Sequence, residues 1–452
     1  MSRNLTLGLL FAIIAVHVVL AASFASVTPF RTPGLLGGRV QIADVGAPDE
    51  RQHVNYVLRL AHGGGFPVFN PKDPNLSETL ESHQPPLFYF LDAAWGTVMN
   101  GYMPPAPPAT EGKEMSQDDG LKLRSLNVLI GAFTIGGVFM LAFWSYGKSE
   151  VALAAAAFAG LLPMLAALDG AVSNDPLLFC LCTWTLALLA KGVSEGWTTR
   201  LALTIGILTG LAILTKTSGI VLLPVILVAV LLKGERPRPS ATQFATALVP
   251  ILVLTVPWFV RNTNLYGDPL ALGAFGQAFG GTAQAKDLIG SFGPAGYWID
   301  MVGGYTIRSF IGTFGYMDVW LTNNGHRNGE PGLYRAAWLL IAIGAAGWVL
   351  AIRQEPKEAK RVHLVNGLFF LAVLLTFLKF NMQYFQAQAR YLLPAIGPIA
   401  AAVGAGLVAL TRDRRLLALG VIVLVFGFLD VFALTRLPGQ FAERTGMAQR
   451  TP

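Results

Sequence analysis

The sequence predicts an all-α membrane protein with about eleven transmembrane helices. Only 13% of its 452 residues are charged, against about 25% in a typical water-soluble domain, and the mean hydropathy is +0.53. The apolar residues gather in blocks close to the ~20 residues that span a bilayer. Because each backbone group inside lipid needs a hydrogen-bond partner within its own segment, we expect these blocks to be helices.

These blocks make residues 1–434 a single polytopic transmembrane domain, followed by a short C-terminal tail, 435–452. The blocks are 5–25, 123–145, 151–169, 174–191, 200–215, 218–232, 241–260, 332–351, 363–379, 390–410 and 416–434. The fifth and sixth blocks are short and are separated only by the residues from Lys216 to Gly219. A fused or re-entrant pair is therefore an alternative to two full spans, and it would reverse the orientation of every later block.

The distribution of positive charge supports eleven spans with the N-terminus in the cytoplasm. In that orientation the short cytoplasmic connections hold Lys148, Lys191, Arg200, Lys233, Arg236, Arg238, Arg353, Lys357, Lys360, Arg361, Arg412, Arg414 and Arg415. The short outer connections hold only Lys216, Lys379 and Arg390. This is the bias that the positive-inside rule requires. The net charge of +7 is therefore a topology signal, and we do not take it as evidence for nucleic-acid binding.

The first apolar block has two interpretations. Arg3 precedes it and small residues follow it, a pattern that is also typical of a cleaved signal peptide. We favour an uncleaved membrane anchor, because the apolar run is long enough to span the bilayer.

Two long segments outside the bilayer, 26–122 and 261–331, are expected to carry the function, since loops of this length are uncommon without one. The first contains a predicted interfacial helix that begins at Pro48, with acidic residues in its first turn. Its apolar face consists of Val54, Val57, Leu58 and Ala61. Asp49 and His53 are four residues apart and can face the same way.

Other parts of the two loops have distinct compositions. Residues 81–91 form a short apolar segment that we interpret as interfacial or re-entrant, and residues 101–120 resemble a mobile excursion. In the second loop, the Gly- and Ala-rich stretch 271–296 has the composition of a flexible flap. The aromatic segment 309–320 suits the level of the lipid headgroups.

Three ordered motifs in this sequence carry a family resemblance. They are Pro48-Asp49-Glu50-x-x-His53, His83-Gln84-Pro85-Pro86-Leu87-x-Tyr89 and Ser173-Asn174-Asp175-Pro176-Leu177. Together they resemble the C-type membrane glycosyltransferases, which include protein mannosyltransferases and lipid A aminoarabinose transferases. The later segments Asn262-x-x-x-Tyr266-Gly267-Asp268-Pro269, Phe310-Ile311-Gly312-x-Phe314-Gly315 and Arg390-Tyr391-Leu392-Leu393-Pro394 are similar to a poorly characterised bacterial branch of that superfamily. The resemblance covers most of the chain.

This resemblance implies transfer of a sugar from a polyprenyl-phosphate carrier to an acceptor, with inversion at the anomeric carbon. It also implies a multi-pass protein of the bacterial plasma (inner) membrane with its active site on the extracytoplasmic face. The essential carboxylate of the family maps onto Asp49, with Glu50 beside it as a second catalytic candidate. The sugar stays unspecified, and the acceptor is a glycan, a lipid or a protein.

The residue types fit this chemistry independently of the family. An attacking hydroxyl needs a carboxylate to accept its proton, and a departing lipid phosphate needs cations to stabilise its charge. The expected substrate-binding residues are His53, His83, Asp175, Lys216, Arg261, Lys379 and Arg390. We expect no cofactor, although Asp, Glu and His side chains together leave a divalent metal open.

Each of these assignments has a structural alternative. The two acidic residues at 49 and 50 suit a helix dipole, His53 and His83 suit interfacial packing, and Asp175 is a favourable helix start. Arg390 would also anchor its helix at the membrane interface by snorkelling.

Two other functions compete with a glycosyltransferase. A transporter or flippase of lipid-linked sugars would usually bury ionisable groups near the middle of the bilayer. From the sequence we expect the span interiors to be almost free of charge, with His17 as the lone titratable exception and a neutral packing residue. A non-catalytic scaffold that binds lipid-linked sugars is the third possibility.

Overall fold

The structure is a computed structural model of the chain. It describes residues 1–30, 35–36, 39–40, 47–74, 76–101, 116–232, 241–321, 332–353, 355, 357–411, 414 and 416–450.

Every predicted apolar block coincides with helix. The helices concerned are α1 (Arg3–Val27), α5 (Gln117–Tyr146), α6 (Ser149–Gly160), α7 (Pro163–Asp169), α8 (Asp175–Glu195), α9 (Thr199–Thr215), η2 (Thr217–Val221), α10 (Leu222–Leu231), α11 (Ala241–Tyr266), α15 (Gly332–Arg353), α16 (Lys357–Asn381), η5 (Ala389–Ala395), α17 (Ile396–Thr411) and α18 (Leu417–Arg450). Within the described ranges, eight helices are long and apolar enough to cross a membrane, or nine if the pair α6 and α7, bent by 65°, forms one span. The chain is therefore a multi-pass, all-α membrane protein.

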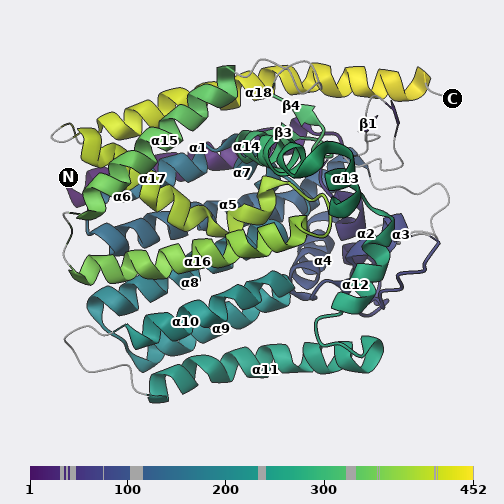
Figure 1. The fold of residues 1–452 in the computed structure, drawn as a ribbon, viewed down its shortest axis with the longest axis horizontal. Coiled ribbons are helices and arrows are strands. Elements are labelled where there is room, and N and C mark those ends of the chain that lie inside the picture. The colour runs from purple at the N-terminus through teal and green to yellow at the C-terminus, as the bar shows by residue number, and fades with distance from the viewer. Residues whose placement is uncertain are drawn as a thin grey trace.

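The two short blocks around Lys216 form separate helices that pack on different neighbours. Helix α9 packs mainly against α11 and α8, whereas α10 packs against α16 and α8. Both are shorter than the eight long helices. The long helices run alongside one another, and the two chain termini lie at opposite ends of the bundle (Figure 1).

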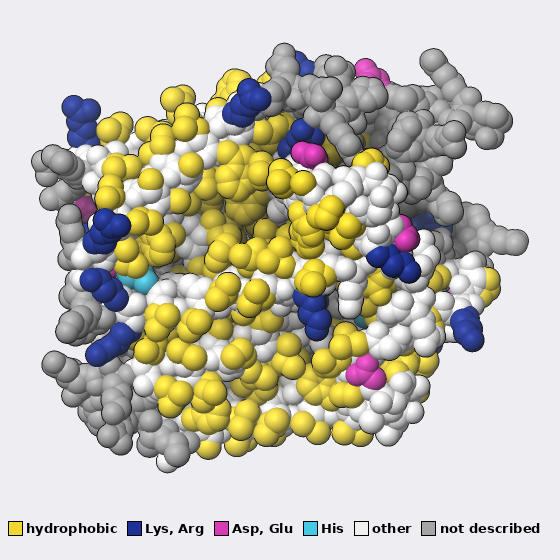
Figure 2. Space-filling model, in the orientation of Figure 1, with side chains coloured by type: hydrophobic (Ala, Val, Ile, Leu, Met, Phe, Trp, Pro, Cys, Tyr) yellow, Lys and Arg dark blue, Asp and Glu magenta, His cyan; other side chains and the backbone are white. Residues whose placement is uncertain are grey.

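Small residues allow the central helices to pack closely. Helix α6 is rich in alanine, and its residues from Val151 to Gly160 are buried. Helices α15 and α17 approach closely at Gly344 and Gly406, where a Cβ on Gly406 would lie 1.7 Å from the Gly344 carbonyl oxygen. Helices in lipid associate through close packing of small residues. Hydrophobicity alone does not drive this association, because lipid tails are as apolar as a neighbouring helix. Hydrophobic side chains cover most of the outer face shown in Figure 2.

The two long loops fold into a cap at one end of the bundle, where α2, α3, α12, α13 and β1 lie together at the right of Figure 1. The first loop contributes α2 (Glu50–Ala61), α3 (Leu76–Thr79), η1 (Leu80–His83), α4 (Leu87–Asn100) and the antiparallel strands β1 (Leu35–Leu36) and β2 (Arg39–Val40). The second contributes α12 (Leu272–Ala278), η3 (Phe279–Gly281), α13 (Ala285–Ala295), η4 (Gly296–Gly303), α14 (Gly304–Ile311) and the antiparallel strands β3 (Thr313–Phe314) and β4 (Val319–Trp320). The helix predicted from Pro48 is present as α2, which begins at Glu50, and its interfacial position stays a prediction.

The cap corrects one sequence prediction. Residues 271–296, predicted as a flexible flap from composition, are instead folded into short helices. Backbone hydrogen bonds tie this segment to the turn after α16, from Ala285 N to Gln383 O (3.0 Å) and from Phe385 N to Ala283 O (2.9 Å). Of the predicted excursion at 101–120, residues 102–115 lie outside the described residues.

The span interiors also hold more ionisable groups than the sequence analysis recognised. His17 is buried and its Nε2 lies 2.9 Å from Asp169 Oδ2, so it is not a lone packing residue. Asp430, in the last predicted span, is fully buried, and neither of its carboxylate oxygens has a hydrogen-bond partner among the described residues. The expectation of a single titratable exception was therefore wrong.

Candidate functional site

A cluster of charged side chains from six segments lies beneath the cap. Its members are Asp49 before α2, His53 in α2, Glu81 in η1, Asp175 at the start of α8, Lys216 between α9 and η2, and Arg390 in η5. Three of the six positions, those of Asp175, Lys216 and Arg390, are at ends of helices in the bundle or in turns between them, which ties the cluster to the bundle.

Two cations and two carboxylates form the centre of this cluster. Arg390 donates a hydrogen bond from Nη2 to Oδ2 of Asp49, and its Nη1 lies 3.8 Å from Oδ2 of Asp175. Lys216 Nζ lies 2.5 Å from the other oxygen of Asp175. The Tyr391 ring lies beneath both cations, with its centroid 5.0 Å from the Arg390 guanidinium and 5.7 Å from Lys216 Nζ. Arg390 therefore joins the two carboxylates into one network.

The local backbone aims Asp49 at this network. Asp49 is the N-cap of α2, yet its φ of 57° is left-handed and its side chain makes no capping hydrogen bond. Aspartate tolerates this region better than most residues, at a cost of about 1–3 kcal/mol. The carboxylate turns toward Arg390 instead of satisfying its own helix, so the sequence-based alternative of a simple helix cap does not describe its contacts.

Burial and charge shift the acid–base properties of the groups in the cap. Burial by itself would raise the pKa of Asp49, but Arg390, with smaller contributions from His53 and Lys216, holds that pKa below its usual value. Burial raises the pKa of Glu81, and the nearby Asp49 charge adds to this, although His53 opposes it. Burial lowers the pKa of His53, against the opposing effect of Glu81 and Asp49. The two carboxylates are therefore tuned in opposite directions.

The two predicted histidines occupy adjacent positions around the cluster. His53 Nδ1 is 2.9 Å from the Tyr89 hydroxyl and 4.0 Å from Oε2 of Glu81. His83 donates from Nδ1 to the Leu80 carbonyl (2.7 Å), and its ring centroid lies 4.9 Å from that of Phe275 in α12. Burial lowers the pKa of His83 to about 4. His83 is therefore a neutral ring at the contact between the two outer loops.

Glu50, the second catalytic candidate, faces away from the cluster. Arg124 donates to both of its carboxylate oxygens, from Nε at 2.7 Å and from Nη2 at 2.6 Å, and the backbone N–H of Val172 donates at 2.9 Å. Arg124 also donates from Nη1 to the carbonyls of Ala25 (2.6 Å) and Thr28 (2.7 Å). Both side chains are fully buried. These contacts make Glu50 a link between α1, α2 and α5, and leave no oxygen for a substrate.

Of the four predicted phosphate-binding cations, the structure brings only Lys216 and Arg390 together. Arg261 donates to the Pro67 carbonyl (2.6 Å) on another face of the cap, and Lys379 is exposed near the end of α16. The described residues thus separate the four cations into one buried pair and two that lie elsewhere.

Comparisons with known proteins concern the fold that carries this cluster. A family profile described as dolichyl-phosphate-mannose-protein mannosyltransferase matches residues 112–260. The oligosaccharyltransferase of Archaeoglobus fulgidus in complex with zinc and sulfate superposes with a TM-score of 0.56 at 13% identity, covering 94% of this chain and 53% of that one. ArnT from Cupriavidus metallidurans, bound to undecaprenyl phosphate, superposes with a TM-score of 0.51 at 18% identity, covering 98% of this chain and 75% of that one. The chain has the fold of the C-type membrane glycosyltransferases.

Two further comparisons complete the picture. The A. fulgidus oligosaccharyltransferase AglB in complex with an inhibitory peptide and a dolichol-phosphate gives a TM-score of 0.55 at 14% identity, covering 95% of this chain and 56% of that one. The chain therefore spans just over half the length of the archaeal proteins it matches. A search among curated proteins found no match.

Within this C-type fold, the sequence analysis missed three members of the site. Glu81 lies two residues before His83 in the segment already singled out, so its position was a usable signal. Tyr391 follows Arg390 directly, and its hydroxyl accepts a hydrogen bond from Arg390 Nη2 (3.1 Å). Tyr316, between β3 and β4, lies in the aromatic segment 309–320 already singled out, and the charge of Asp49, with burial as a second cause, raises the pKa of this tyrosine.

The cluster does not fit a divalent metal. In the part of the chain that the structure describes, no three His, Cys, Asp or Glu side chains are grouped to ligate one. The carboxylates of Asp49 and Asp175 are instead engaged by Arg390 and Lys216. We therefore derive no step through a metal ion.

Proposed function

We propose that this chain is a glycosyltransferase that moves a sugar from a polyprenyl-phosphate carrier to an acceptor hydroxyl, with inversion and with Asp49 as the base. The observation that carries the proposal is the pairing of Lys216 and Arg390 around Asp49 and Asp175 beneath the cap. Two convergent cations suit a phosphate, and a carboxylate within reach of them suits an attacking hydroxyl. The fold, and the polyprenyl phosphates named with the AglB and ArnT structures, support the same carrier class.

In the proposed reaction, the acceptor oxygen forms a bond to the anomeric carbon as the bond from that carbon to the phosphate oxygen breaks. The bonding electrons leave with the phosphate, where Arg390 and Lys216 stabilise the new charge. The acceptor proton passes to the Asp49 carboxylate. A single displacement from the face opposite the leaving group inverts the anomeric configuration.

The Asp49–Arg390 pair adds an order to these events. While Arg390 is bound to Asp49, it holds the pKa of that carboxyl low, which makes Asp49 a weak base. A donor phosphate that draws Arg390 away would remove this cause, and the pKa of Asp49 would rise. The base would thus gain strength only when the donor is in place.

The remaining members of the cluster have supporting roles in the proposal. Glu81 has an oxygen, Oε2, with no hydrogen-bond partner among the described residues, and we assign it to a hydroxyl of the acceptor or the sugar. The charges of Glu81 and Asp49 both act on His53, and in the proposal His53 orients the Glu81 carboxylate. Glu50 is a positioning residue that fixes the start of α2, directly beside Asp49.

We place this chemistry on the extracytoplasmic face of a bacterial plasma membrane. The cap lies at the end of the bundle opposite the N-terminus (Figure 1), where the sequence has few basic connections. The partners are then a polyprenyl-linked sugar, an acceptor that is a glycan, lipid or protein, and membrane lipids.

The test is sugar transfer from a panel of polyprenyl-phosphate sugars by the purified protein in nanodiscs, with and without EDTA. We expect Asp49→Asn to lower turnover by about 10²–10⁴-fold while leaving donor binding intact. Lys379→Gln, which changes an exposed cation at the same end of the bundle, is the matched control and should keep its activity. An Asp49→Asn variant as active as the wild type would remove Asp49 from the base position.

Transport of lipid-linked sugars is a second candidate, which the buried Asp430 and the His17–Asp169 pair favour. Vesicles that contain the protein would then move the carrier lipid across the bilayer without consuming any donor. Donor consumption that depends on Asp49 would exclude this function as the primary one.

A further inference from the structure

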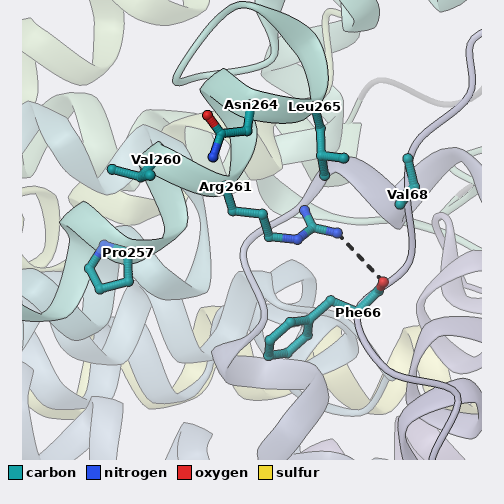
Figure 3. Close-up of a pocket in the computed structure, with 7 residues that line it drawn as sticks. All are labelled: Phe66, Val68, Pro257, Val260, Arg261, Asn264 and Leu265. Carbon is teal, nitrogen blue, oxygen red and sulfur yellow. Dashed lines mark hydrogen bonds between the residues drawn. The ribbon is translucent and has the colours of Figure 1, made fainter.

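A groove lies on the lipid-facing side of the cap, between the outer end of α11 and the segment 66–68 of the first loop (Figure 3). Its volume is about 620 Å³, and it is lined by Phe66, Val68, Pro257, Val260, Arg261, Asn264 and Leu265. This volume is within the range of small-molecule sites, about 300–1,000 Å³. The groove does not include any member of the Asp49 cluster.

The first loop is hydrogen-bonded to α11 at two residues, Arg261 and Tyr266. Arg261 donates to the carbonyls of Pro67 (2.6 Å) and Phe66 (3.5 Å), and the hydroxyl of Tyr266 accepts a hydrogen bond from Phe69 N (2.9 Å). The glycines at 63 and 65, with φ of 71° and 65°, allow the chain to reach this position from the end of α2. The groove is therefore a built feature of the cap and not a gap between loosely placed segments.

The walls of the groove are apolar and open to the surroundings. Phe66 is 42% exposed, Val260 is 52% exposed and Leu265 is 45% exposed. Below them, the same side of α11 continues as an exposed apolar strip formed by Val249, Leu252, Val253 and Val256. Since α11 is a candidate membrane span, this strip faces acyl chains and leads directly into the groove.

Arg261 brings a positive charge that no described carboxylate neutralises. Its guanidinium carbon lies 4.7 Å from the Trp258 ring centroid, and its hydrogen bonds go to neutral carbonyls and to the neighbouring Asn262 amide at 3.5 Å. Lys216 and Arg390, by contrast, are each paired with an aspartate. Figure 3 shows the Arg261 side chain extending toward Phe66, with the Asn264 amide near the other end of that side chain.

The level of the groove in the membrane matches a lipid headgroup. Trp258 and Tyr266 flank Arg261 at the end of α11, and tryptophan and tyrosine concentrate where the hydrocarbon meets the headgroups. A fixed cation above an apolar channel at this depth has the chemistry of a site for an amphiphile with a phosphate head and a hydrocarbon tail.

We propose that the groove is a binding site for an anionic lipid of the surrounding leaflet, with the lipid phosphate on Arg261 and a hydrocarbon chain along α11. This site is separate from the proposed donor phosphate site at Lys216 and Arg390. The stacked rings of Tyr56 and Tyr89, whose centroids are 3.9 Å apart, lie next to His53 on the cluster side, and Tyr89 bonds to that histidine. The tyrosine pair does not line the groove, and the inference does not depend on catalysis.

The test measures the binding of phosphatidylglycerol to the purified full-length protein in detergent. Native mass spectrometry detects the bound lipid. We expect one lipid to bind in preference to phosphatidylcholine. Arg261→Gln should weaken its binding by about tenfold or more, because it removes the charge that the lipid phosphate would contact. Lys379→Gln removes the same charge from an exposed site outside the groove and should leave the affinity unchanged.

Val260→Trp provides a second variant that keeps Arg261 and fills the groove with a ring. It should also weaken phosphatidylglycerol binding, and this result does not depend on the folding of the Arg261 variant. Equal losses for Arg261→Gln and Lys379→Gln would overturn the proposal, since they would indicate general charge attraction. Displacement of the lipid by inorganic phosphate alone would also overturn it, because the tail would then contribute nothing.

Discussion

Two neighbouring carboxylates in this protein, Asp49 and Glu50, each pair with a buried arginine, yet the two pairs are built differently. Glu50 is fully buried, both of its oxygens are hydrogen-bonded, and all three nitrogens of Arg124 donate. The Asp49 side chain is 19% exposed and bound to Arg390, whose Nε has no partner among the described residues.

The difference in hydrogen bonding indicates which of the two pairs could bind a ligand. Buried polar groups in folded proteins are nearly always hydrogen-bonded, so an unsatisfied group calls for an explanation. The pair with Glu50 is complete within the protein. Around Asp49, by contrast, Arg390 Nε, Asp175 Oδ2 and Glu81 Oε2 all lack hydrogen-bond partners in the described part of the chain. We infer that the first pair serves the fold and that the second is completed by substrate.

The largest expected effect is on stability, and it should separate the two pairs. Glu50→Gln leaves the Arg124 charge buried without compensation, which costs about 3–5 kcal/mol. Asp49→Asn should cost less than about 2 kcal/mol, because Arg390 keeps Asp175 nearby and the site is partly open. Circular dichroism during unfolding in the same detergent measures the free energy of unfolding of each variant. Equal losses of this free energy would show that both pairs are structural.

His83 is a third kind of polar group, half-buried and without a carboxylate partner among the described residues, and its lowered pKa should make the fold sensitive to acid. Its pKa is lowered to about 4 in the folded protein, against 6.5 for an ordinary histidine. The unfolded chain therefore binds a proton first, and stability should fall by up to about 3 kcal/mol as the pH drops from 6.5 to 4. His83→Gln should flatten this part of the stability profile. A profile that is unchanged in the variant would assign the acid sensitivity to other groups.

The proposed donor site should depend on the shape of Arg390 as well as on its charge. Arg390→Gln is expected to raise the KM for the polyprenyl-phosphate donor by about tenfold to a hundredfold. This range corresponds to the usual free-energy contribution of a hydrogen bond to a charged group. Arg390→Lys should recover only part of this loss, because lysine cannot reach Asp49 and Asp175 at once. Steady-state kinetics with each variant provide the measurement. Full recovery by lysine would mean that a single point charge is sufficient.

The pH dependence of kcat/KM should identify the second carboxylate. The pKa of Glu81 is raised, chiefly by burial, whereas that of Asp49 is lowered by Arg390. As the pH falls, Glu81 is therefore protonated first and loses an acceptor oxygen. We expect Glu81→Gln to move the acidic limb of the profile to lower pH, whatever its effect on the maximum rate. An acidic limb at the same pH in the variant would show that Glu81 does not titrate in this reaction.

The fold was largely predictable because its main signal is local. A block of apolar residues near bilayer length must be helical in lipid, whatever it packs against. The start of α2 was equally local, since Pro48 and the acidic residues after it mark a helix N-terminus. Asp430 shows the limit of this reasoning, because its burial depends on the helices that surround it and was missed.

The members of the site were harder to predict because their contacts are distant in sequence. Asp49 and Arg390 are 341 positions apart, and Glu50 and Arg124 are 74 apart. From the sequence, Glu50 was a second catalytic candidate beside Asp49, since only the contact with Arg124 gives it a structural role. Composition also failed for the stretch 271–296, whose short helices are held by pairing with the turn after α16.

The smallest expected effect concerns Lys379, which the sequence could not distinguish from Arg390. The turn between them is closed by Asn381, which accepts a hydrogen bond from Gln386 N (3.0 Å) and donates to Gln386 O (3.2 Å). This turn leads Arg390 inward to the cluster and leaves Lys379 exposed on α16. Lys379→Gln should therefore change the donor KM by less than about twofold, since exposed charges contribute little. A change as large as that for Arg390→Gln would mean that the donor phosphate lies nearer to α16 than to Asp49, and the contrast between complete and incomplete pairs would no longer locate the site.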